Sequence, residues 1–336
     1  MHLQTAAAVV AMLLASMGPA ARAESPAAGA ECSALASIPI PAGDIGTAPS
    51  DCEAAELYFG PDGNGGNFAA ARHCAYAQRA AHRGDEMFDG SATLMMLYAN
   101  GRGVRRNIPL AKRFACELTD DDVTGERLQR LDAMAEQAPG KPFDVCDDVS
   151  STFMLVNCAD RDNRFAAFRR KRRIDAFSAS WTVPQRRAYE SLRKAADTYF
   201  AASSEGEVDQ RGTGRDLFTM EAHEKLEAGL AAAIEATERH GAPSPSPQPF
   251  SSEDMKLNRA YQAWLRQLAA AAKDATIPGA VAAAGVRDAQ RKWLAYREAW
   301  VVFGTSRFPG VPADTWRAWA THERTAVLKD RASDSQ

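Results

Sequence analysis

The chain has 336 residues, a length that allows two modest domains with cores of their own. Its 46% hydrophobic and 25% charged content is typical of a globular protein and excludes wholesale disorder, a collagen-like fibre and a membrane bundle. The 40 Lys and Arg residues nearly balance the 43 Asp and Glu residues, so nothing in the charge indicates a nucleic-acid partner or an anionic membrane surface. The 67 alanines, the strongest helix formers, favour an all-α fold.

The N-terminus has the pattern of a secretory signal peptide at residues 1–23. Residues 6–17 form an apolar run that is too short to span a bilayer. Gly18-Pro19 and the small-x-small triplet Ala21-Arg22-Ala23 come next, which predicts cleavage after Ala23. We therefore expect a mature protein that is periplasmic or secreted and has no membrane span.

All six cysteines lie in the first half of the chain. Their even number permits fifteen pairings, and no pair has zinc-finger or CxxC spacing. In an exported protein this pattern favours disulfides over buried free thiols, and it predicts no metal site. The cysteines are Cys32, Cys52, Cys74, Cys116, Cys146 and Cys158.

A repeat with a spacing of 40 residues organises the same half. Leu57-Tyr58 aligns with Leu97-Tyr98, Gly63 with Gly103, and Asn67 with Asn107, which predicts a helix, a glycine-rich turn and a second helix, used twice. Asn107 is expected to cap the second helix of the second copy, with Pro109 in its first turn. The second copy, LMMLYANGRGVRRNIPLAKRFA, resembles the Sel-one-like repeat, a relative of the tetratricopeptide repeat.

That resemblance implies a helical repeat region at 51–140, preceded by an extended N-terminal segment at 24–50. Two copies are fewer than a free solenoid needs, so they are expected to pack against the C-terminal part of the chain. In an antiparallel hairpin with Phe59 opposite Asn67, Cys52 lies opposite Cys74, and these two are our preferred disulfide. Cys146 and Cys158 could close a local loop, which leaves Cys32 and Cys116 by elimination.

The second half contains long amphipathic segments and a Pro/Ser-rich linker at 241–252. One segment has a stripe with helical spacing made of Ala289, Trp293, Tyr296, Trp300 and Phe303. A shift of 104 residues aligns the last four with an earlier stripe, Tyr189, Leu192, Ala196 and Tyr199. The agreement indicates either an internal duplication or a chance match of two heptad-like helices. In both cases we interpret the aromatic stripe as core.

Two motifs in this half resemble the lysozyme inhibitor LprI family. LNRAYQAWLRQL contains LN-x-x-Y, and VRDAQRKWLAYREAWVVFG contains AQ-x-x-W-x-x-Y-R. The family's usual cysteine in this last helix is absent, and Trp300 and Val301 stand near its place. The resemblance implies an LprI-like helical domain at 145–336. It also implies a protein-binding module of the bacterial cell envelope whose partner could be lysozyme. The family-motif residues are Leu257, Asn258, Tyr261, Ala289, Gln290, Trp293, Tyr296 and Arg297.

Two charged segments are candidate interaction sites. Glu205, Glu207 and Asp209 alternate in a glycine-containing stretch between two predicted helices. This stretch is either a solvated connector or a loop that presents carboxylates to a cationic partner such as lysozyme. The basic run Arg169–Arg173 wraps around a helix at 100° per residue, which favours scattered salt bridges over an anion-binding patch.

The sequence indicates no enzyme, catalytic residue or cofactor. Ser191 and Lys194 have SxxK spacing, but the chain has no SDN or KTG motif after them. His223-Glu224 has Glu227 where the HExxH zinc motif needs a second histidine. The alternative interpretation is a cell-wall or β-lactam-directed hydrolase with an unrecognised site, because catalytic carboxylates can be paired in space without a sequence signature.

Overall fold

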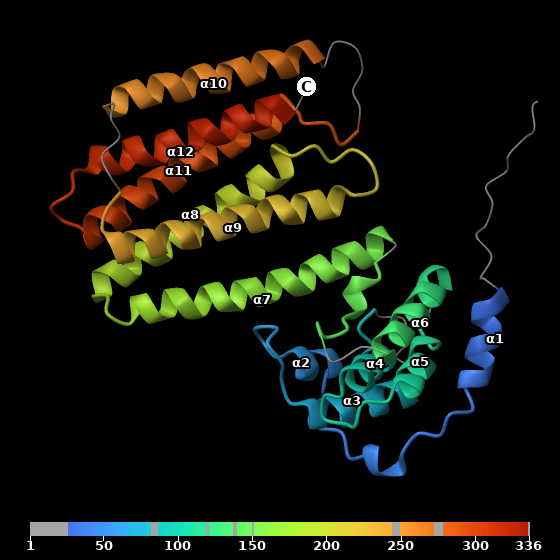
Figure 1. The fold of residues 1–336 in the computed structure, drawn as a ribbon. Helices are drawn as coiled ribbons and strands as arrows, with labels where there is room; N and C mark the ends of the chain where they lie inside the picture. Colours follow the sequence, from blue (N-terminus) through green and yellow to red (C-terminus); the bar gives the residue numbers. More distant parts are fainter. Residues whose placement is uncertain are drawn as a thin grey trace, which may run out of the picture.

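The computed structural model describes residues 26–81, 87–118, 121–136, 140–149, 151–243, 249–271 and 278–334. Within these residues the chain forms twelve α-helices and two short 3-10 helices without a β-strand, which confirms the all-α prediction (Figure 1). The predicted signal peptide lies outside the described residues. Among the helices that are described, none is both long enough and apolar enough to cross a membrane.

The N-terminal half is built from antiparallel helical hairpins. α2 packs on α3, α4 packs on α5, and α3 joins the two pairs. The Asn67 side chain accepts a hydrogen bond from the Ala70 backbone N–H at 3.1 Å, and Asn107 accepts one from Leu110 at 3.1 Å. The predicted Asn107 cap is therefore confirmed, and its counterpart 40 residues earlier does the same. The elements are α1 (Pro26–Leu35), η1 (Ala42–Asp44), α2 (Ala54–Phe59), α3 (Phe68–Ala80), α4 (Gly90–Asn100), α5 (Ile108–Ala115), α6 (Asp121–Glu136) and η2 (Val145–Asp147).

Three disulfides stabilise this half, and they are the three pairs considered from sequence. Cys52–Cys74, Cys146–Cys158 and Cys32–Cys116 have Cα–Cα distances of 6.0, 5.8 and 5.5 Å, within the normal range. The expectation of an extended segment over 24–50 is wrong for Pro26–Leu35, which forms helix α1. This alanine-rich helix is held against α5 by Cys32–Cys116 and by an ion pair of Glu31 with Lys112.

Helix α7 (Thr152–Ser178) belongs to both halves of the molecule. Near its start, the guanidinium of Arg161 lies 4.6 Å from the ring centroid of Phe59, and Phe165 packs against the same ring at 5.7 Å. Toward its other end, Ile174 is buried in the core of the C-terminal helices. One continuous helix thus connects the two hydrophobic cores. The exact boundaries of the two domains remain a prediction.

The C-terminal half consists of six long helices that lie side by side. From one edge to the other their order is α10, α12, α11, α8, α9 and α7 (Figure 1). They form two three-helix units, α7–α9 and α10–α12, and in each unit the third helix packs on both of the others. This shared packing order is what an internal duplication predicts. The remaining helices are α8 (Val183–Gly206), α9 (Arg215–His240), α10 (Phe250–Ala271), α11 (Ala283–Arg307) and α12 (Ala313–Asp334).

The two units meet through α8 and α11, which run antiparallel. The rings of Tyr189 and Phe303 have centroids 5.9 Å apart, and Tyr199 stacks on Tyr296 at 5.3 Å. The expected aromatic core is confirmed, because the two tryptophans of the stripe and Phe303 are at most 2% exposed. At one end of the contact Gly206 meets Gly285, where a Cβ on Gly206 would lie only 2.9 Å from the Gly285 Cα.

The predicted linker at 241–252 is partly helical. Helix α10 begins at Phe250, within the bounds predicted for the linker. Residues 244–248 lie outside the described part of the chain. The connection nevertheless falls between the two three-helix units, where a duplication of such units would place it.

Candidate functional site: an ion-paired groove between α7 and α8

An open groove of about 1140 Å³ crosses the first three-helix unit. Helices α7 and α8 form its walls and α9 forms its floor. The groove exists because α7 packs on α9 without a comparable contact with α8, whereas α10 in the second unit also touches α11. Apolar side chains line the inner part of the groove: Ile174, Tyr189, Leu230, Ala231 and Ile234.

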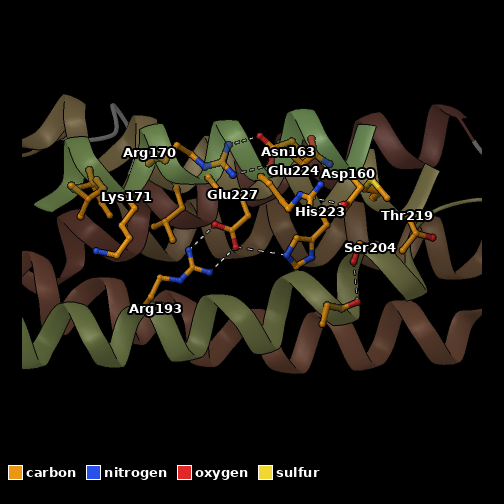
Figure 2. A pocket seen from close by; sticks show the side chains of 18 of the residues that line it. Asp160, Asn163, Arg170, Lys171, Arg193, Ser204, Thr219, His223, Glu224 and Glu227 are labelled. Atoms are coloured by element: carbon orange, nitrogen blue, oxygen red, sulfur yellow. Dashed lines mark hydrogen bonds and ion pairs between the residues drawn. The ribbon is translucent and has the colours of Figure 1, made fainter. Parts of the chain in front are cut away.

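Two arginine–glutamate pairs connect the walls with the floor (Figure 2). On α7, Arg170 forms a two-pronged pair with Glu224 of α9, with a second bond of 2.8 Å. On α8, Arg193 donates to both carboxylate oxygens of Glu227, at 2.8 and 2.6 Å. Such two-pronged pairs fix the orientation of both side chains. They hold charged groups rigidly above an apolar floor.

The surroundings of Arg193 keep its guanidinium protonated. Burial alone would lower the pKa of Arg193, but the hydrogen bonds with Glu227 and with Asp197 outweigh it, and the pKa is raised. His223 Nε2 lies 3.7 Å from Glu227 Oε1, on the side away from Arg193. Burial raises the pKa of Tyr189, which keeps its hydroxyl neutral. The groove therefore carries fixed charges above its apolar inner part.

The far end of the groove carries carboxylates with fewer partners. Asp160 is paired with Arg164 at 3.4 Å, and both side chains are more than half exposed. Glu205 of α8 and Asp216 of α9 line the same groove and have no ion pair within the described part of the chain. Figure 2 shows Asp160, Ser204 and Thr219 toward this end and Arg170, Lys171 and Arg193 toward the other. Net negative charge thus gathers at one end of the groove.

The three acidic residues selected from sequence do not act together. Glu207 is 1% exposed, so the expectation that it lies on an exposed acidic loop is wrong. Its carboxylate accepts hydrogen bonds from Arg324 and from Ser203 Oγ, the latter at 2.7 Å. Asp209 stays near the surface, where the Arg211 guanidinium lowers its pKa. Of the three, only Glu205 lines the groove.

The basic run on α7 forms scattered salt bridges, as predicted. Arg170 pairs with Glu224, Lys171 with Asp175, and Arg173 with Glu235. Arg169 donates to the backbone carbonyl of Asp62 in the N-terminal half. The run therefore fixes α7 against both of its neighbours.

The family-motif residues of α10 and α11 are mainly structural. Leu257 and Trp293 are at most 2% exposed, and Gln290 accepts a hydrogen bond from Arg324 at 3.1 Å. Arg297 lies over the Trp293 ring at 5.4 Å. Tyr261 and Tyr296 are half-buried and pack on the same core. Asn258 is the exception to a core assignment: it is exposed and donates to Asp254.

Sequence reasoning missed most of the groove. The groove residues Arg170, Arg193 and Asp216 are far apart in the chain, and no local motif connects them. One signal was available: His223, Glu224 and Glu227 are spaced for a single face of α9. Over the residues with described positions, no group of His, Cys, Asp and Glu side chains is arranged to hold a metal ion.

The fold and groove define an all-helical, disulfide-bonded protein with an open, ion-paired groove. Residues 247–332, which include α10, α11 and all but the last two residues of α12, match the family model described as lysozyme inhibitor LprI. The resemblance in this region is therefore confirmed, while the groove and the N-terminal hairpins lie outside the match. No curated protein and no solved structure matches the chain significantly.

Proposed function

We propose that this protein is an exported protein-binding module of the bacterial cell envelope, and that it binds and inhibits lysozyme. The observation that carries the proposal is the match of residues 247–332 to a family of lysozyme inhibitors. Three disulfides support a site of action outside the reducing cytosol. The signal peptide at 1–23 and a periplasmic or secreted location are part of the proposal.

The N-terminal half enters the proposal as a Sel-one-like repeat region at 51–140. The paired hairpins and the matching Asn67 and Asn107 caps support this assignment. Helical hairpins of this kind serve as protein-binding scaffolds. We therefore assign the N-terminal half to partner binding together with the six-helix half.

Charge distribution suggests where a basic partner such as lysozyme would dock. Residues 247–332 contain 13 Lys and Arg against 8 Asp and Glu, so the net charge of this region does not attract a cationic protein over long range. Residues 24–151 contain 11 Lys and Arg against 20 Asp and Glu.

The carboxylate end of the groove, with Glu205 and Asp216, adjoins this acidic half because Asp160 is two residues from Cys158. Opposite charges steer association and fix the register of a complex. We therefore propose that the carboxylate end of the groove binds a basic segment of lysozyme. Asp209, which is paired with Arg211, is outside it.

Lysis of purified cell wall tests the proposal. The protein is added to cell wall with and without lysozyme, turbidity is followed, and the affinity for lysozyme is measured by calorimetry at low and at physiological salt. We expect inhibition of lysis and weaker binding at the higher salt concentration. Lysozyme activity that is unchanged at a large excess of the protein contradicts the proposal. Intrinsic hydrolysis of wall or β-lactam by the protein alone supports the alternative function, a hydrolase.

A pair of charge-matched variants tests the docking site. Glu205→Gln with Asp216→Asn removes the two groove carboxylates, and we expect at least tenfold weaker binding and a smaller salt dependence. Glu190→Gln with Asp314→Asn removes two exposed carboxylates outside the groove and is the control. Equal effects of the two double substitutions contradict the assignment of the groove, even when inhibition itself is observed.

A further inference from the structure

A second cavity, of about 350 Å³, opens between α9 and α12. The antiparallel helices α8 and α11 form its base, so it lies at the junction of the two three-helix units. Its lining differs from that of the charged groove, because six aromatic side chains contribute to it. They are Tyr199, Phe200, Trp293, Tyr296, Trp300 and Trp319.

Small residues on α9 leave this space open. Ala222, Gly229 and Ala233 face the aromatic side chains across the cavity. A Cβ added to Gly229 would meet nothing within 4 Å, so no close packing in the described structure requires a glycine there. A glycine in mid-helix destabilises the helix relative to alanine. Gly229 is exposed and lies at the open rim of the cavity, so a side chain much larger than a methyl group at this position would occupy that space.

The polar groups at the base of the cavity are already paired with one another. Arg324 donates to Gln290 at 3.1 Å, to the Tyr199 hydroxyl at 2.8 Å and to Glu207 at 2.9 Å. The Arg324–Glu207 pair is neutral overall, so a charged ligand would be desolvated here without a counter-charge. A sugar would likewise leave most of its hydroxyls without partners. The lining favours a ligand whose buried part is apolar and flat.

The entrance to the cavity can accept one polar substituent. Lys225 of α9 and Asp330 of α12, both largely exposed, lie 4.0 Å apart across it. We propose that this cavity binds an uncharged aromatic molecule of two or three fused rings, with a single polar group directed at Lys225 and Asp330. Its volume is near the lower end of the range of about 300–1000 Å³ for ligand sites. It is also roughly twice the engineered cavity of about 150 Å³ that binds benzene.

Titration with 2-naphthol tests this proposal on the full mature protein. We expect saturable binding of one molecule per chain by calorimetry, with a change in fluorescence from Trp293, Trp300 and Trp319. N-acetylglucosamine at the same concentrations serves as the comparison and is expected not to bind. Absence of saturable naphthol binding overturns the proposal, and so does displacement of naphthol by N-acetylglucosamine.

Substitutions on α9 locate the binding. Gly229→Leu and, separately, Ala222→Leu fill the cavity from its wall, and we expect each to weaken naphthol binding at least tenfold. Gly229→Ala adds a single methyl group and is the matched control, with binding changed less than threefold. Thermal unfolding of each variant shows that the fold is kept. Folded leucine variants that bind naphthol as tightly as the parent protein overturn the assignment to this cavity.

Discussion

Arg324 of α12 and Glu207 at the end of α8 form a hydrogen-bonded ion pair inside the bundle, with 2.9 Å between Arg324 Nη1 and Glu207 Oε2. Their side chains are 1% and 0% exposed. The pair connects residues 117 positions apart and links one three-helix unit to the other. Because neither charged group is in contact with water, each is stabilised mainly by the opposite charge of the other.

Removal of one charge from this pair is expected to destabilise the protein strongly. Glu207→Gln leaves the Arg324 guanidinium buried without its counter-charge, which costs about 3–5 kcal/mol in the free energy of unfolding. Denaturant unfolding measures the loss. Glu205→Gln, two residues away on the surface, is the control and is expected to change stability by less than about 0.5 kcal/mol. Similar losses for the two variants contradict a buried pair.

Glycine substitutions should separate two kinds of site within the bundle. Gly285→Ala places a Cβ 2.7 Å from the carbonyl oxygen of Gly206, so α8 and α11 must move apart. We expect a loss of about 1–3 kcal/mol. Gly229→Ala, where the Cβ meets nothing, is expected to stabilise the protein by about 0.5–1 kcal/mol. Thermal unfolding midpoints show whether each variant is more or less stable than the parent protein. A change in the same direction for both variants contradicts the close approach of Gly206 and Gly285.

Reduction of the disulfides is expected to destabilise the N-terminal half selectively. Disulfide loss costs about 3 kcal/mol for the two short loops and about 4.5 kcal/mol for Cys32–Cys116, whose cysteines are 84 residues apart. Helices α8–α12 contain no cysteine. Hydrogen exchange with and without reductant makes the comparison. Protection should be lost in α2–α5 and kept in α8 and α11, whereas uniform loss would indicate one cooperative unit.

Buried tyrosines predict a limit to stability in alkali. Burial raises the pKa of six tyrosines: the buried Tyr58, Tyr76, Tyr98 and Tyr199 and the half-buried Tyr189 and Tyr296. A raised pKa in the folded state means that the stability contribution is complete below about pH 10, the unfolded value. This contribution to stability is lost as the pH rises through the pKa values of the tyrosines in the folded state. Phenolate absorbance from these side chains should therefore appear together with the loss of helical circular dichroism. Ionisation of all six in a fully helical protein contradicts their burial.

The fold class, the Cys52–Cys74 disulfide and the aromatic core were predictable because their signals are local or pairwise, whereas Cys32–Cys116 followed only by elimination. Asn67 and Asn107 repeat at a fixed spacing before helices, and hairpin geometry alone placed Cys52 opposite Cys74. The stripe that contains Trp293 and Trp300 has helical spacing. Each of these features depends on periodicity that a single sequence contains.

The candidate site depends on tertiary packing and was not predictable. Glu207 stands between two acidic residues near glycines, so the sequence favours an exposed loop, but its partner Arg324 lies in another helix far along the chain. Glu205 and Asp216 come together only because α8 and α9 pack side by side. Likewise, the groove itself reflects how far α7 stands from α8, which no residue pattern encodes.

Pairing of α8 with α11 has a consequence for how such a fold can be divided. In this protein α8 covers the aromatic face of α11. A polypeptide that contained only α10, α11 and α12 would therefore expose that face to water. Two copies of that shorter polypeptide would have to associate to hide the same surface. In this protein one covalent chain supplies both three-helix units, so their association does not depend on concentration and survives dilution.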